Sequence, residues 1–292
     1  MSLAYLAFLT VCIVWGTTYL AIAVALESVP VLLVAGLRWM FAGLVMSALM
    51  LGSRRGLPSP RLWAPLALLG FLMNVIGNGL VVYAEQYVPS GLTAVLIATT
   101  PFWSASLEGL LPGGERFSRR SLLGLSLGFS GIVVLVWPEL THGGAGGTQF
   151  IIGVIAIQVA CVGWVIGTSF ARRHELGDNP FRSTALQMVF SGSMLLAAAT
   201  AHGDWAHLSF TPRTIAAMLY LSIAGSLVAY SAYIYAIQHL PLQLVSLYAY
   251  INPMIAVALG TLFLNEPISI RIVIAAALVL IGTWIVGKRS AS

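Results

Sequence analysis

The chain has 292 residues, of which 59% are hydrophobic and only 8% are charged. Soluble domains carry a charge on about 25% of their residues, so a soluble fold of this length would lack the charges to cover its surface, and we expect lipid to surround most of the chain. This composition excludes a secreted domain, a cytosolic enzyme and a disordered chain, and the net charge of +5, carried mainly by short loops, does not indicate nucleic-acid binding.

Ten apolar runs follow one another along the chain with only short loops between them. A helix needs about 20 apolar residues to cross a hydrocarbon core of roughly 30 Å, and runs of this length without dyad alternation favour helices over a β-barrel. The sequence therefore predicts an all-α integral membrane protein with ten transmembrane helices, at residues 3–26, 30–51, 62–84, 90–111, 121–137, 150–171, 181–201, 213–236, 242–264 and 271–287.

The basic residues predict how these helices are oriented. With the N-terminus in the cytoplasm, eleven of the 14 Lys and Arg residues fall in cytoplasmic segments, two fall on the opposite side, and Arg38 lies within a span. We therefore expect both termini in the cytoplasm. The first run is long enough to span and no Lys or Arg precedes it, which favours a retained helix over a cleaved signal peptide.

The two halves of the chain repeat each other. Six short motifs recur in the same order at offsets of 149 to 152 residues: 16–19 with 167–170, 37–43 with 186–192, 83–89 with 235–241, 100–101 with 252–253, Glu115 with Glu266, and Gly131 with Gly282. We predict two five-helix repeats, at 1–141 and 150–292, joined by a Gly-rich linker at 142–149. Because five is odd, the second repeat must be inverted, and inverted repeats are typical of transporters with a substrate site near the membrane midplane.

The repeat, the motif Trp15-Gly16-Thr17-Thr18 and the acidic residue after each fourth span resemble the EamA-type exporters of the drug/metabolite transporter superfamily. Within that superfamily the chain is most similar to the bacterial amino-acid exporters of the YddG type. The resemblance implies ten helices, a central cavity and a location in the bacterial inner membrane. Ile166 stands at the second-repeat position of Trp15, so Trp15 need not have a symmetric role.

Polar residues inside spans are costly unless they face a cavity or a partner. Asn74, Asn78 and Glu85 share one helical face at spacings of four and seven, which predicts either a water-lined binding face or hydrogen bonds between helices. Arg38 can pair with a carboxylate such as Glu85, reach the outer surface or meet a substrate carboxylate. Pairing is favoured, because the equivalent residue in the second repeat is the neutral Gln187.

Further candidates lie in the later spans. Pro101 and Pro253 interrupt matched spans, where a missing backbone donor predicts gating hinges that also form the cavity wall. Trp103 and Trp164 lie deep in their spans and predict either an apolar wall for the substrate or helix packing. Glu108 is a possible proton carrier or a partner of a loop arginine. Weaker candidates for substrate contact are Tyr83, Gln158, Tyr230 and Tyr248.

These residues point to transport rather than to catalysis. The histidines lie in or beside loops, and Cys12 and Cys161 lie in separate apolar runs, so we expect no catalytic centre, metal or cofactor. The expected partners are a small-molecule substrate and the lipid bilayer. Amides, hydroxyls and aromatic rings suit a zwitterion, and a single arginine is too few for a phosphorylated sugar. We predict export of hydrophobic or aromatic amino acids by alternating access; other neutral metabolites or drugs, or a channel, are the alternatives.

Overall fold

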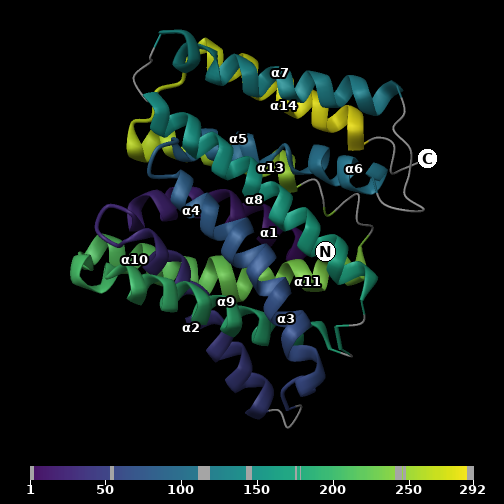
Figure 1. Cartoon of the computed structure of the whole chain (residues 1–292), viewed down its shortest axis with the longest axis vertical. Helices are drawn as coiled ribbons and strands as arrows, with labels where there is room; N and C mark the ends of the chain where they lie inside the picture. The colour runs from purple at the N-terminus through teal and green to yellow at the C-terminus, as the bar shows by residue number, and fades with distance from the viewer. Residues whose placement is uncertain are drawn as a thin grey trace.

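The computed structural model describes residues 3–52, 56–110, 119–142, 147–174, 176–177, 179–240, 245 and 248–287. Helices occupy most of these ranges (Figure 1). The first half holds α1 (Leu3–Ala25), α2 (Val31–Gly52), η1 (Pro60–Leu62), α3 (Trp63–Gly70), η2 (Phe71–Gly79), α4 (Leu80–Ala84), α5 (Ser90–Ile97), α6 (Thr100–Leu110) and α7 (Arg119–His142). The second half holds α8 (Gly147–Arg173), α9 (Pro180–His202), η3 (Asp204–His207), α10 (Pro212–Tyr220), η4 (Leu221–Val228), α11 (Ala229–His239), α13 (Tyr248–Leu264) and α14 (Ile270–Gly287).

The helices are apolar enough to make this an integral membrane protein. In the described ranges, six continuous helical segments have the length and composition of membrane spans: Leu3–Ala25, Val31–Leu51, Pro60–Ala84, Gly147–Arg173, Pro180–His202 and Pro212–Ala236. Shorter apolar helices cover Leu122–Leu135, Tyr248–Leu264 and Ile270–Gly282. The fourth predicted span is divided into α5 and α6, and the count of ten crossings stays a prediction. The core of the predicted linker, residues 143–146, lies outside the described residues.

Equivalent helices of the two halves pack against each other. Helix α2 lies along α9, and α7 lies along α14, as the top pair in Figure 1 shows. In the same way, α1 packs on α10, η4 and α11, just as its counterpart α8 packs on α3, η2 and α4. These contacts are retained when the two halves are exchanged, as expected for two repeats related by an approximate two-fold axis.

Both halves contain a π-helical segment at the same place. The segment η2 lies in the middle of the third predicted span and η4 in the middle of the eighth. A π turn closes its hydrogen bonds over five residues rather than four, so it shifts the side chains that follow and leaves backbone carbonyls available to other groups. Such turns are frequent at functional sites, and here they bring polar side chains to the centre of the bundle.

The two predicted proline interruptions differ in structure. Helix α5 ends at Ile97 and α6 begins at Thr100, so the chain breaks next to Pro101, and the Thr100 hydroxyl donates to the Ile97 carbonyl at 2.6 Å. Pro253, in contrast, lies inside the continuous helix α13. There the Asn252 amide, with its nitrogen facing the carbonyls of Cys12 and Tyr248, donates to them at 2.9 and 3.1 Å. The Asn252 side chain thus ties α13 to α1 beside Pro253, and the helix continues through the proline.

Candidate functional site

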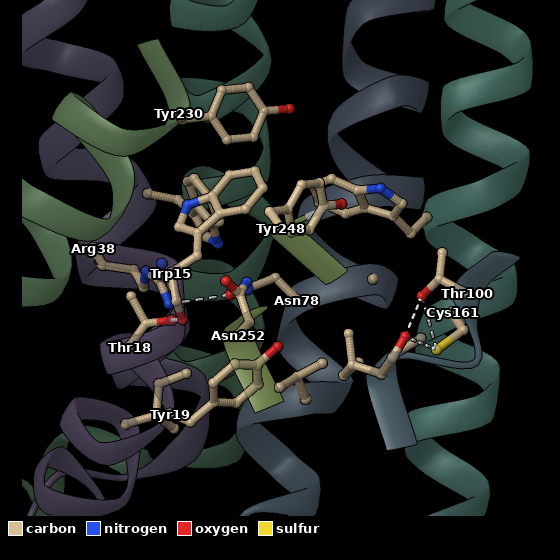
Figure 2. A pocket seen from close by; sticks show the side chains of 17 residues that line it. Trp15, Thr18, Tyr19, Arg38, Asn78, Thr100, Cys161, Tyr230, Tyr248 and Asn252 are labelled. Carbon is tan, nitrogen blue, oxygen red and sulfur yellow. Dashed lines mark hydrogen bonds between the residues drawn. The ribbon is translucent and has the colours of Figure 1, made fainter. Parts of the chain in front are cut away.

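A central cavity lies between the two repeats, with a volume of about 110 Å³. At about 30 Å³ for each water in the liquid, this is room for roughly four water-sized groups. Figure 2 shows the side chains that surround it. They are Trp15, Thr18, Tyr19 and Ile22 of α1; Arg38 and Trp39 of α2; Gly77, Asn78 and Val81 of η2 and α4; Ile97 and Thr100 beside the chain break; Ala160, Cys161 and Trp164 of α8; and Tyr230, Tyr248 and Asn252 of α11 and α13.

Aromatic rings gather around Trp15 on one wall of the cavity. The ring of Trp15 has its centroid 5.1 Å from that of Tyr233, 5.2 Å from Tyr248, 6.2 Å from Tyr230 and 6.3 Å from Trp164. Its Nε1 donates to the carbonyl of a glycine in η4, at 3.2 Å, which fixes the indole across the repeat interface. Rings held in this way form a rigid apolar surface at a low cost in conformational entropy.

Arg38 is the charged side chain among the described residues that line the cavity. Its side chain is buried, with only 3% exposed, and its Nε donates to Ser226 Oγ at 2.9 Å. Its Nη1 donates to Asn78 Oδ1 at 3.3 Å, as the dashed line in Figure 2 indicates, and the guanidinium carbon lies 4.8 Å from the centre of the Trp39 ring. Both hydrogen-bond acceptors are neutral, so they orient the guanidinium without neutralising it.

Gln187 occupies the corresponding position in the second repeat. Its Nε2 donates to Asn74 Oδ1 and to the Tyr230 hydroxyl, both at 3.4 Å. Asn74 and Tyr230 align with Ser226 and Asn78, the two partners of Arg38. The same arrangement of hydrogen bonds therefore occurs in both halves, with a cation in one and a neutral amide in the other.

A polar group lies across the cavity from Arg38, where the chain breaks between α5 and α6 (Figure 2). The Thr100 hydroxyl is 3.5 Å from the Cys161 thiol, and the Thr99 hydroxyl donates to the Leu96 carbonyl at 2.7 Å. These neutral groups can accept or donate hydrogen bonds, so this side of the cavity suits polar solute groups of either sign.

Some of the predicted site residues line this cavity and others do not. Arg38, Asn78, Trp164, Tyr230 and Tyr248 line it. Asn74 does not: it is fully buried and donates to Ser191 Oγ at 3.0 Å, in a hydrogen bond between helices. The predicted shared face of Asn74 and Asn78 assumed α-helical geometry, whereas both residues lie in the π-helical η2, where a spacing of four no longer keeps side chains in register.

Two other predicted residues border a second cavity. Trp103 and Gln158 lie, with apolar residues of α7 and α8, around a space of about 400 Å³. Trp103 Nε1 donates to Gln158 Oε1 at 3.0 Å, and Thr99 Oγ1 lies 3.0 Å from the same oxygen. Tyr83 lies elsewhere again, with its ring 5.5 Å from that of Tyr87. The structure thus places these three predicted contacts away from the central cavity.

The acidic candidates are also outside the central cavity. Glu85 occupies the residue position directly after α4 and is 9% exposed. Neither of its carboxylate oxygens has a hydrogen-bond partner among the described residues. No ion pair joins Glu85 to Arg38 among the described residues, although the two charges act on each other, so their pairing stays a prediction. Glu266 accepts from the backbone nitrogens of Ser90 and Gly91 at 2.7 and 3.0 Å and so caps α5. The side chain of Glu108 lies outside the described residues.

Sequence reasoning missed several cavity residues, of which Trp15 is the most central. Its signal was present, because a tryptophan in the middle of an apolar run lies far from the interfaces that tryptophan usually prefers. Trp39 lies in the middle of its run and carried the same signal, whereas Thr18 and Cys161 did not, since only the packing of the helices brings them to the cavity.

Comparisons with known proteins agree with this architecture. The model of the EamA-like transporter family matches residues 2–137 and again residues 151–288. The uncharacterized inner membrane transporter YedA of Escherichia coli (strain K12) is 33% identical over 258 residues, which cover 88% of this chain and 81% of that protein. The uncharacterized transporter YvbV of Bacillus subtilis (strain 168) is 25% identical over 286 residues, covering 98% and 91%.

Two more distant matches extend the comparison. A chloroplastic WAT1-related protein of Arabidopsis thaliana is 29% identical over 277 residues, covering 93% of this chain and 66% of that protein. A crystal structure with 21% sequence identity superposes with a TM-score of 0.66 and covers 99% of both chains. This last match shows a shared fold.

Proposed function

Because the chain belongs to the EamA-like transporter family, as the matches over both halves and the 33% identity show, we propose that it exports small zwitterionic metabolites, chiefly hydrophobic or aromatic amino acids. That it is a membrane transporter of the drug/metabolite family follows from the family itself. The substrate and the direction of transport are the proposal. One observation carries it: a buried guanidinium and a wall of aromatic rings face the same small cavity between the repeats.

The two poles of this cavity support an amphipathic solute. The guanidinium of Arg38 suits a carboxylate, because its planar donors match the two oxygens. The rings around Trp15 suit an apolar or aromatic side chain. Among the described residues that line the cavity, the remaining polar groups are neutral, which disfavours a phosphorylated solute that would need several cations.

Alternating access is the transport mechanism that the pattern of contacts supports. Two inverted repeats that pack through equivalent helices can exchange conformations, and this exchange moves the cavity opening from one side of the membrane to the other. The chain break beside Pro101 provides a bending point next to the cavity wall. In this proposal the protein lies in the bacterial inner membrane with both termini in the cytoplasm.

Reconstituted proteoliposomes test the proposal directly. We expect uptake of radiolabelled phenylalanine or leucine that saturates with concentration and is stimulated by unlabelled substrate on the opposite side of the membrane. A channel would give uptake without this stimulation. Saturable transport of neutral drugs but of no amino acid would favour the wider drug/metabolite alternative over our proposal.

Two variants test whether transport depends on the central cavity. Trp164→Ala and Asn78→Ala should reduce phenylalanine transport about tenfold or more while the amount of folded protein is maintained. Trp103→Ala provides the matched control, because this tryptophan borders the second cavity. Equal losses in all three variants, or normal rates in Trp164→Ala and Asn78→Ala, would contradict this location of the site.

A further inference from the structure

The described residues that line the central cavity carry positive charge and no negative charge. Of the described residues that line it, Arg38 alone carries a charge, and the others are aromatic, aliphatic, hydroxyl, amide or thiol side chains. No carboxylate stands among them to receive the ammonium group of a zwitterion. The charge complementarity of the cavity is therefore with an anion.

Arg38 retains donors for such an anion. Its Nε and Nη1 are engaged by Ser226 and Asn78, and within the described ranges its Nη2 makes no hydrogen bond and no acidic side chain lies within ion-pair distance. The charge of Glu85 acts on Arg38 from nearby, but Glu85 does not line the cavity. A buried guanidinium without a counter-charge is costly, and a carboxylate entering the cavity would remove much of that cost.

The aromatic wall provides the second half of the recognition. Trp15 and Tyr248 lie beside the Arg38–Asn78 pair in Figure 2, so a solute whose carboxylate meets Arg38 places its remaining atoms against these rings. A cationic group on the solute would enter a cavity that already contains the guanidinium of Arg38. The surroundings thus favour the carboxylate and the apolar tail, and they offer the ammonium group no charged partner.

We propose that Arg38 is the specificity-determining residue of the transport site and that the substrates are amphipathic monocarboxylates, for which the carboxylate is required and an α-ammonium group is dispensable. Apolar amino acids are then one part of a wider class that includes the corresponding carboxylic acids without an amino group. This inference rests on the proposed function, because it assumes that the central cavity binds the transported solute.

Three matched compounds separate the two charged groups of the solute. Phenylalanine carries both, 3-phenylpropanoate has only the carboxylate, and phenethylamine has only the ammonium. Binding to the purified full-length protein in lipid nanodiscs can be measured by calorimetry near pH 7. We expect 3-phenylpropanoate to bind at least as tightly as phenylalanine, and phenethylamine to bind at least tenfold more weakly than either.

Each result has a distinct meaning. If phenylalanine binds more than tenfold more tightly than 3-phenylpropanoate, the further inference is overturned and the proposed amino-acid function stands. If phenethylamine binds as well as the carboxylates, Arg38 does not select the substrate and the inference also fails. If none of the three binds or is transported, the proposed function itself fails.

The variant Arg38→Gln tests the residue without disrupting the fold. Gln187 shows that a glutamine in the equivalent position of the other repeat makes the equivalent pair of hydrogen bonds. We therefore expect Arg38→Gln to retain the thermal stability of the parent protein and to bind both carboxylates about 10- to 100-fold more weakly, as loss of a charge-assisted hydrogen bond predicts. Arg38→Lys keeps the charge but loses the planar fork, so its affinity for the carboxylates should lie between those of the parent protein and Arg38→Gln.

A double variant distinguishes recognition from charge balance. If Arg38 only offsets the nearby Glu85, then Arg38→Gln combined with Glu85→Gln should restore the binding of 3-phenylpropanoate. If Arg38 contacts the carboxylate, the double variant should bind it no better than Arg38→Gln alone. Restored binding, or unchanged binding in Arg38→Gln itself, would overturn the proposal.

Discussion

The packing of α2 against α9 depends on two glycines at matched positions of the repeats. A Cβ atom on Gly192 would lie 2.6 Å from the backbone nitrogen of Met40 and 2.7 Å from its Cα, and a Cβ on Gly43 would lie 2.7 Å from the backbone nitrogen of Val189. Backbone atoms cannot rotate away. The variant Gly192→Ala therefore requires the helices to separate locally by about 0.8 Å before ordinary contact, which begins at 3.4 Å, is reached.

The expected cost follows from this separation. A radial gap of about 0.5–1 Å loses roughly a quarter to a half of each dispersion contact, and overpacking a tight interface typically costs about 1–3 kcal/mol. Helix propensity acts in the opposite direction, because alanine is better than glycine in a helix interior by about 0.5–1 kcal/mol. The steric effect is larger. We expect a net loss of about 1–2 kcal/mol, equivalent to a melting temperature lowered by roughly 2–6 °C for a chain of this size.

A matched glycine tests the sign of the effect. The nearest side-chain atom to a Cβ on Gly79 is Leu195 Cδ2 at 3.6 Å, so Gly79→Ala gains helix propensity without a clash. Thermal unfolding in one detergent–lipid mixture and at one scan rate should place Gly79→Ala at or above the parent protein and Gly192→Ala below it. Equal or higher stability of Gly192→Ala would refute the view that close backbone approach holds α2 to α9.

Three further variants test a hydrogen bond between helices, a helix cap and an exposed ion pair. Asn74→Leu loses the hydrogen bonds that Asn74 donates to Ser191 and accepts from Gln187, so stability should fall by about 0.5–1.5 kcal/mol, while the KM for transport should not change; a raised KM would return Asn74 to the site. Glu266→Ala should destabilise the start of α5 by about 0.5–2 kcal/mol, because two backbone amides lose a charged acceptor; unchanged hydrogen exchange at those amides would contradict this. Arg213→Gln breaks the exposed 3.1 Å ion pair with Glu27, so the melting temperature should hardly move, and a large fall would show that this pair holds the helices together.

The sequence predicted the features that depend on composition and spacing alone. Long apolar runs predict membrane helices because the bilayer imposes a minimum length, and the described parts of these runs are helical apart from a few end residues and the break between α5 and α6. The repeat was also visible, since paired motifs such as the one that contains Gly43 and Gly192 keep their order. Those glycines fill equivalent places in the α2–α9 contact.

The composition of the site was harder to predict, for two geometric reasons. The π turns of η2 shift the side-chain register, so Asn78 faces the cavity while Asn74 bonds to α9. The break between α5 and α6 redirects the chain, so Thr100 lines the central cavity while Trp103, three residues later, borders another. Neither effect can be read from apolar periodicity, which assumes a continuous α-helix. The partner of Arg38 was missed because Ser226 lies 188 residues away.

Differences between the repeats, rather than their similarities, distinguish the proposed transport site. Where both halves keep glycine, as at Gly43 and Gly192, the residues hold the helices together. The Arg38 position, in contrast, contains glutamine in the second half, although both side chains make equivalent hydrogen bonds. A symmetric scaffold can therefore exchange conformations while Arg38, the one cation among the described residues that line the cavity, stays on one repeat. In the proposed mechanism a bound carboxylate remains on Arg38 throughout the exchange, and only the opening of the cavity changes sides.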